Sequence, residues 1–348
     1  MRTVYWEDES IMLVDQTALP GRYEQIKVTT IERLARAIYL LEVRGAPAIG
    51  VSAAFGVAMA ARQSKAKDAA GLMADIQTAH DVLAKTRPTA VNLFWALNRM
   101  MKFVQAHLAD WQNLPQLLLD EAQRMADEDV SINKRMAQYG AELIPDGAVI
   151  LTHCNCGPLC TVDIGTAMGP VILAHQQGKK IHVYTDETRP LLQGARLNAW
   201  ELANAGVPYT LITDNHAAWM MQTHHIDMVM IGVDRVAANG DTAAKIGVYG
   251  LAVLAKYHGI PFYAVSPLST IDMTLKSGKE IPIEARDPDE VRKVMGNYIT
   301  MPDANVENYA FDVTPHELIA GVVTEFGICQ PPYEASFKQM FALQEQQA

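Results

Sequence analysis

Cys154, Cys156 and Cys160 lie close together in the stretch "AVILTHCNCGPLCTVDIG", residues 148–165, and His153 directly precedes the first of them. Thiols and imidazoles at this density can bind a metal, form a redox pair or a disulfide, or provide one reactive thiolate. Spacing and context favour the last of these.

A structural zinc site usually draws four ligands from two close pairs held apart by a loop. Here the candidates crowd one strand-to-helix turn, and the remaining cysteine, Cys329, is distant in sequence. Adjacent strand residues such as His153 and Cys154 point to opposite faces, which disfavours a shared metal. A redox pair usually reads Cys-x-x-Cys, which this spacing does not match. We therefore predict no metal, with a metal site and a redox pair as the alternatives.

Cys156 and Cys160 are most simply small buried hydrophobes near a helix start. Cys154 differs because it lies at the predicted tip of a strand. A thiol beside a helix N-terminus has a lowered pKa, which suits a proton carrier or a nucleophile.

Asp234 is the second candidate, in "GVDRVAANGD". It follows an apolar strand, so we expect it to be poorly solvated, and burial favours a carboxyl group that can donate a proton at neutral pH. The alternatives are an ion pair with Arg235 or a helix cap.

Two arginines precede proline-initiated helices, Arg44 in "EVRGAPAIG" and Arg87 in "KTRPTAVNL". Helix N-termini and arginines bind anions, so both places are candidate phosphate contacts. A third such start, "DETRPLLQGARLNAWEL", carries Gln193 in its first turns.

These residues must be positioned by a sheet. Five short apolar runs occur at residues 148–153, 180–185, 208–213, 226–232 and 260–266. Helical stretches separate them, and the last of these is expected to start near Asp241. This pattern predicts a doubly wound parallel sheet, in which ligands bind beyond the carboxyl ends of the strands. His153, Cys154, Asp186, Glu187, Arg189, Asp214, Asn215, Asp234 and Arg235 are then expected along one rim.

The first half of the chain is different. Short alternating runs in the first thirty residues predict small strands, and 3–4 spacing of apolar residues predicts helices thereafter. We predict an α/β protein in three parts. These are a smaller, mainly helical N-terminal domain with short strands (1–114), a connecting helix (115–146) and a Rossmann-like catalytic domain (147–348).

Composition excludes several classes. The chain has 348 residues and a net charge of −10, without the Lys/Arg clusters that a nucleic-acid partner requires. Its apolar runs are too short to span a bilayer, and its start lacks the layout of a signal peptide. We predict a cytoplasmic protein with a small-molecule substrate.

The sequence resembles the methylthioribose-1-phosphate isomerase family of methionine salvage. The motifs that carry the resemblance are "RGAPAIGVSAAFG", "TRPTAVNL", "ILTHCN", "GTA", "DETRPLLQGARLNAWEL", "TDN", "GVDRVAANGDTAAKIG" and "RDPDEV". The resemblance as a whole runs from about Val28 to Tyr333, nearly the whole chain. The resemblance implies an aldose–ketose isomerase without a metal or organic cofactor, built as a homodimer of two-domain subunits.

The family's catalytic cysteine and aspartate match Cys154 and Asp234. Its substrate-binding positions match Arg44, Gly45, Ala46, Arg87, Gln193, Ala244 and Lys245.

Two departures from the family pattern stand out. Cys156 and Cys160 replace small residues other than cysteine. Ala244 replaces an asparagine, which removes one side-chain hydrogen bond to the substrate, so the sequence does not determine which substituent the sugar carries on C5. The alternatives are an isomerase of 5-deoxyribose 1-phosphate, a ribose-1,5-bisphosphate isomerase, or a non-catalytic regulatory relative. A dinucleotide-dependent oxidoreductase needs Gly-x-Gly-x-x-Gly after the first strand, which this chain lacks.

Overall fold

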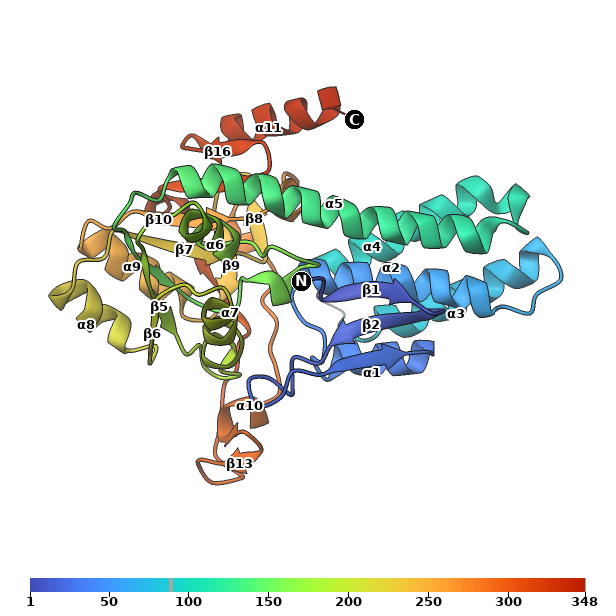
Figure 1. Cartoon of the computed structure of the whole chain (residues 1–348), viewed down its shortest axis with the longest axis horizontal. Helices are drawn as coiled ribbons and strands as arrows, with labels where there is room; N and C mark the ends of the chain where they lie inside the picture. The colour runs from blue at the N-terminus through green and yellow to red at the C-terminus, as the bar shows by residue number, and fades with distance from the viewer. Residues whose placement is uncertain (88–89, 348) are drawn as a thin grey trace. The chain divides into compact units, whose positions relative to one another are not determined.

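The computed structural model describes residues 1–87 and 90–347. The chain divides into two compact units (Figure 1). One comprises Met1–Ser131 and Pro158–Gly165, and the other Ile132–Gly157 and Thr166–Ala348. Within the described residues, no helix is both long and apolar enough to cross a membrane.

The N-terminal unit combines an antiparallel sheet, in the order β1-β2-β3, with a group of helices. Its elements are β1 (Val4–Glu7), β2 (Ser10–Val14), β3 (Gln25–Val28), α1 (Ile31–Tyr39), α2 (Ala46–Gln63), α3 (Ala69–Ala84), α4 (Val91–His107), η1 (Leu108–Asp110) and the first part of α5 (Leu114–Glu142). Helix α2 is apolar on nearly every side and is buried at the centre of this unit's core. The short N-terminal strands and the helices that follow confirm the prediction for this region.

A short 3₁₀ turn, η2 (Pro158–Cys160), returns to the N-terminal unit and packs beside the start of α2. Gly45 precedes α2 with φ +94°, and a Cβ built there would lie 2.2 Å from the carbonyl oxygen of Cys160. Only glycine fits this combination of backbone angle and close approach.

The C-terminal unit is built on a seven-stranded sheet in the order β16-β15-β10-β7-β4-β5-β6. Its strands are β4 (Val149–Thr152), β5 (His182–Asp186), β6 (Tyr209–Ile212), β7 (Met228–Gly232), β10 (Phe262–Val265), β15 (Gly321–Thr324) and β16 (Gly327–Cys329). All neighbouring pairs are parallel except the β15–β16 hairpin. The five predicted strands are present, whereas β15 and β16 extend the sheet beyond the prediction.

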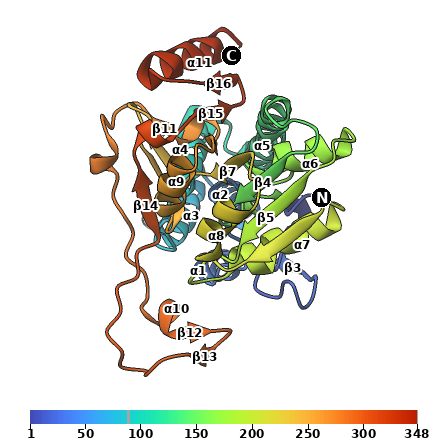
Figure 2. The same cartoon turned by 90° about the vertical axis from the view of Figure 1, so that its left-hand side faces the viewer.

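Helices cover both faces of this sheet (Figure 2). Ile150 packs with α6 (Met168–Gln176), α7 (Ala199–Asn204) and the end of α5. Its neighbour Leu151 packs on the other face with α8 (His216–Thr223), α9 (Val248–Tyr257) and α11 (Tyr333–Gln347). Alternation along a strand divides its apolar side chains between two cores. The doubly wound α/β class is therefore confirmed.

A second, smaller sheet in the order β11-β8-β9-β14 lies in the same unit. The remaining elements are β8 (Arg235–Ala237), β9 (Thr242–Lys245), η4 (Leu268–Thr270), β11 (Ile271–Asp272), η5 (Gly278–Glu280), α10 (Asp289–Arg292), β12 (Lys293–Val294), β13 (Asn297–Tyr298), β14 (Phe311–Thr314) and η6 (His316–Leu318). The prediction of a helix start near Asp241 is wrong. The turn at "ANGD" closes a β8–β9 hairpin, with Gly240 at φ +94°, and α9 begins only at Val248.

Helix α5 continues from the N-terminal unit into the C-terminal unit, near the predicted connecting helix 115–146. The predicted division at residues 114 and 146 stays a prediction.

Candidate active site

Cys154 and Asp234 follow neighbouring parallel strands. β4 ends at Thr152 and β7 at Gly232, and the two strands pair directly through Ile150 and Met228. Each candidate residue lies two positions beyond the end of its strand. The order of the strands therefore brings both residues to the carboxyl edge of the sheet, where open α/β folds bind ligands.

Cys154 has a left-handed backbone, with φ +70°. This conformation is costly for a residue with a side chain and persists only where the surroundings enforce it. The N–H of Cys154 donates to the hydroxyl of Thr188 at 2.9 Å, and Thr188 itself has φ +63°. We predicted that strand alternation orients Cys154, but β4 ends at Thr152, before His153. The loop that follows β4 orients Cys154 instead.

Asp214, after β6, secures the loop that holds Cys154. Its two carboxylate oxygens accept the backbone N–H groups of Thr188 and Arg189, each at 2.7 Å. The tips of β4, β5 and β6 are thus tied together in one chain of hydrogen bonds. This confirms that His153, Cys154, Asp186, Arg189 and Asp214 gather at one edge.

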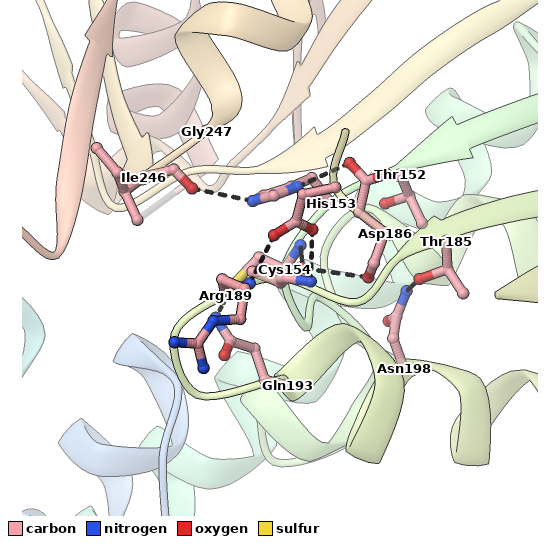
Figure 3. Close-up of polar contacts among 12 residues, drawn as sticks. Thr152, His153, Cys154, Thr185, Asp186, Arg189, Gln193, Asn198, Ile246 and Gly247 are labelled. Atoms are coloured by element: carbon pink, nitrogen blue, oxygen red, sulfur yellow. Dashed lines mark hydrogen bonds and ion pairs between the residues drawn. The ribbon is translucent and has the colours of Figure 1, made fainter. Parts of the chain in front are cut away.

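Gln193 lies against the sulfur of Cys154 (Figure 3). Its Nε2 donates to Sγ at 3.4 Å, while its Oε1 is buried and has no hydrogen-bond partner among the described residues. Gln193 precedes a π-helical turn, η3 (Gly194–Asn198), instead of opening a regular α-helix. Such turns often occur at functional sites.

His153 and Asp186 form a buried pair at 2% and 1% exposure (Figure 3). Nδ1 of His153 lies 2.8 Å from Oδ2 of Asp186, and Nε2 lies 3.0 Å from the carbonyl oxygen of Ile246. Burial raises the pKa of Asp186 to about 6. Burial lowers the pKa of His153, but the hydrogen bond and the charge of Asp186 outweigh it, so the His153 pKa is raised.

His153, Asp186 and Asp214 also bring possible metal-binding atoms within 4.8 Å of one another. Both nitrogens of His153 and both oxygens of Asp214 already take part in the hydrogen bonds described above. A histidine ligand must present a bare nitrogen to a metal. The geometry therefore fits a network that holds protons better than a set of metal ligands.

Asp234 lies in the connection between β7 and β8 and is half-buried, so it is more solvated than predicted. Its N–H donates to the carbonyl of Ala243 in β9 at 2.9 Å. Arg235 pairs with Asp272 at 3.8 Å. The predicted alternative of a helix cap is wrong, because a β-strand follows Asp234.

Ala244 and Lys245 end strand β9, beside Asp234. Ala244 is fully buried and belongs to the apolar cluster beneath the sheet. Nζ of Lys245 lies 4.7 Å from the ring centre of Phe311, a cation–π contact that directs the ammonium group.

The other four predicted binding residues lie in the N-terminal unit. Arg44 and Gly45 immediately precede α2, Ala46 is its first residue, and Pro47 lies in its first turn, as predicted. Arg87 follows the end of α3 and is half-buried. Residues 88 and 89, which lie within the "TRPTAVNL" motif, are outside the described residues.

All four cysteines are free thiols. Cys156 and Cys160 are buried, and burial raises the pKa of Cys156 to about 12. Cys154 is the more accessible of the three. We predicted that a helix start lies beside Cys154. In the structure the start of α6 contacts Cys156, because the N–H of Met168 donates to the carbonyl of Cys156 at 3.1 Å.

Several supporting residues were not identified from the sequence. Asn155 donates to the buried carboxylate of Glu201 at 2.5 Å, and a Cβ at Gly157 would lie 2.3 Å from that carboxylate. Thr188 was missed likewise, and His153 and Asp186 were expected at the rim but not as a hydrogen-bonded pair. A signal was present, since adjacent strands in the predicted sheet end in "THCN" and "TDET".

Comparison with known proteins agrees with this arrangement. One family model, the Initiation factor 2 subunit family, matches residues 42–331. A methylthioribose-1-phosphate isomerase from Fervidobacterium nodosum is 50% identical over 343 residues, which cover 97% of each chain. A crystal structure of 5-methylthioribose 1-phosphate isomerase from Pyrococcus horikoshii OT3 matches at a TM-score of 0.92 and 49% identity, covering 98% of this chain and 96% of the other.

A crystal structure of the translation initiation factor eIF-2B, subunit delta, from A. fulgidus matches at a TM-score of 0.88 and 42% identity, covering 98% and 99% of the two chains. Matches of this length and identity extend over both units of the fold. The chain therefore belongs to the Initiation factor 2 subunit family and, within it, to the methylthioribose-1-phosphate isomerases.

Proposed function

We propose that this protein is an aldose–ketose isomerase that converts 5-methylthioribose 1-phosphate to 5-methylthioribulose 1-phosphate in methionine salvage. Relatives with this activity in their names share about half of its residues over nearly the whole chain. The observation that carries the proposal is the arrangement of Cys154 and Asp234 at the tips of neighbouring strands. A thiol and a carboxyl group there provide two groups for acid–base chemistry.

The reaction poses a specific chemical problem. The C1 oxygen of the substrate carries phosphate, so the ring cannot open to a free aldehyde. We assign Asp234 as the acid that protonates the ring oxygen. The bond between C1 and that oxygen then breaks, which leaves a hydroxyl on C4 and a positive charge shared by C1 and its phosphate oxygen.

We assign Cys154 as the group that moves the second proton. Its thiolate removes the proton from C2, and the electrons of that C–H bond form a C1–C2 double bond, giving an enol phosphate. The thiol then returns the proton to C1, while the C2 hydroxyl gives its proton to the Asp234 carboxylate and becomes the ketone. Both residues end in their starting states, so the cycle balances without an external oxidant or base.

Binding roles follow the resemblance of the motifs. We assign the phosphate to Arg44, Arg87 and the N–H groups that begin with Gly45 and Ala46, because a helix N-terminus and guanidinium groups both attract phosphate. Gln193 and Lys245 are assigned to the sugar's oxygens. Ala244 can offer only backbone groups to the substrate, so the hydrogen bond from the family's asparagine side chain is absent. This difference bears on which sugar phosphate the protein prefers.

Turnover with two substrates tests the function. Purified protein is incubated with 5-methylthioribose 1-phosphate and, separately, with 5-deoxyribose 1-phosphate, and the ketose product is measured. We expect the higher kcat/KM for the methylthio sugar. A preference for the deoxy sugar would instead support the alternative isomerase, and turnover of neither would support a regulatory relative.

Heavy water tests the route of the hydrogen. Transfer through the Cys154 thiol allows exchange with solvent, so we expect deuterium at C1 of the product. A direct hydride shift from C2 to C1 would leave C1 free of deuterium.

We further propose that the protein is a homodimer in the cytoplasm, as the family resemblance implies. Light scattering coupled to size exclusion measures the mass in solution directly. A mass near that of one 38.3 kDa chain would contradict the dimer.

A further inference from the structure

The side chain of His153 forms hydrogen bonds to two different parts of the C-terminal unit at once. Nδ1 meets the carboxylate of Asp186, which ends β5, and Nε2 meets the carbonyl of Ile246, in the connection between β9 and α9. A carbonyl oxygen can only accept, so Nε2 must carry a hydrogen. If Asp186 is ionised, Nδ1 must carry one too, and the ring is then a cation.

The surroundings of the ring favour that cation. Asp186 faces it from β5, Asp214 from the connection after β6, and Asp312 from β14; each of these carboxylates interacts electrostatically with the imidazole. From β9, the ammonium of Lys245 is directed over Phe311. Three carboxylates around one buried imidazole stabilise its protonated form. The Cys154 thiol also interacts electrostatically with the ring.

The ring is also tightly packed on the side of the β9–α9 connection. A Cβ built on Gly247 would lie 3.1 Å from Cε1 and 3.2 Å from Nε2 of His153. The N–H groups of Gly247 and Tyr249 donate to Asp312, at 2.7 Å and 3.0 Å. The imidazole therefore has one position, fixed between the loop that carries Cys154 and the connection that follows Lys245.

We propose that His153 is a positioning residue for the isomerase: as an imidazolium held between Asp186 and Ile246, it fixes the Cys154 loop and stabilises the Cys154 thiolate. This inference rests on the proposed function for its role in turnover. The predicted thiolate at Cys154 does not rest on the proposed function, because it can be measured in the protein without substrate. The mechanism above needs a thiolate to accept the proton from C2, and a neighbouring cation increases the thiolate fraction.

The test measures the thiol directly. The rate of Cys154 alkylation by iodoacetamide is followed by mass spectrometry from pH 5 to 10 in the wild type and in His153→Gln. Glutamine keeps a hydrogen-bond donor but cannot carry the charge. His182→Gln is the matched control, because His182 lies at the opposite end of β5 from Asp186.

We expect the alkylation midpoint of His153→Gln to lie about one pH unit above that of the wild type, which corresponds to roughly tenfold slower labelling below the midpoint. His182→Gln should match the wild type. The acid limb of the pH profile of kcat should shift in the same direction, with KM changing less. An unchanged or lowered midpoint in a folded His153→Gln protein would overturn the proposal, whether or not the isomerase activity is found.

A second measurement needs no variant. In wild-type protein labelled with ¹⁵N-histidine, both ring nitrogens of His153 should give imidazolium shifts at pH 7. A neutral ring at that pH would overturn the proposal as well.

Discussion

The side-chain amide of Gln193 donates to the sulfur of Cys154 at 3.4 Å, and its own oxygen is buried without a partner among the described residues. A buried carbonyl oxygen without a hydrogen bond is costly, and such costs are often found at binding sites. One side of this amide therefore donates to the thiol, and we propose that the other side accepts a hydrogen bond from a hydroxyl group of the substrate.

Replacement of Gln193 by methionine tests both contacts. Methionine has a similar volume but neither donates nor accepts strongly, so we expect kcat to fall by at least about tenfold, on the scale of losing one positioned hydrogen bond in the transition state. Steady-state kinetics provides the measurement. Gln177→Met, at an exposed position after α6, is the control and should behave as the wild type. Equal kinetics for the two variants would remove Gln193 from the site.

The catalytic pair has its own test. Cys154→Ser and Asp234→Asn should each lower kcat by more than ~10²-fold, the usual scale for loss of a positioned acid or base. Circular dichroism should show that both variants are folded. Cys156→Ala and Cys160→Ala are the matched controls and should retain most activity, because these thiols are buried. Near-normal turnover in Cys154→Ser would end its assignment as proton carrier.

Gly45 should be irreplaceable for structural reasons. Alanine there must adopt φ +94° and would place its Cβ 2.2 Å from the Cys160 carbonyl oxygen. The left-handed angle alone costs about 1–2 kcal/mol, and the collision with backbone adds to it. Gly178→Ala is the control, because Gly178 has φ +91° but nothing within 4 Å of the new Cβ. Urea denaturation should show a larger loss of unfolding free energy for Gly45→Ala; equal losses would contradict the contact.

Asp241 should stabilise the fold in a pH-dependent manner. Burial alone would raise the pKa of this carboxyl, but hydrogen bonds from Asn239, Gly278 and His316 outweigh burial and lower it to about 2. Because its pKa is lower in the folded state, its contribution is complete above the unfolded value and is lost as the pH falls toward 2.

Asp241→Asn should therefore lower the free energy of unfolding at pH 7 by about 1–3 kcal/mol, the cost of unsatisfied donors. The difference from the wild type should shrink between pH 4 and pH 2. Asp303→Asn, at an exposed position in the same unit, is the control. A difference that stays constant across this range would contradict the lowered pKa.

The secondary-structure prediction was correct where a short run of neighbouring residues carries the hydrophobic pattern. Apolar runs identified β4, β5, β6, β7 and β10, because a strand buried on both faces consists largely of apolar residues. The four-stranded sheet was missed, since strands such as β11 are only two residues long and leave almost no pattern. The β8–β9 hairpin was missed although its pairing is local, because its strands are only three and four residues long.

The sequence by itself determined the α/β class, the family and the two residues assigned to the chemistry, because motif spacing and strand-end polarity are local properties. Only the tertiary structure decided how Cys154 is held. Its left-handed backbone, its bond to Thr188, the amide of Gln193 and the buried pair of His153 with Asp186 join the ends of different strands. Such contacts arise only once the order of strands in the sheet is set, since that order decides which strand ends are neighbours.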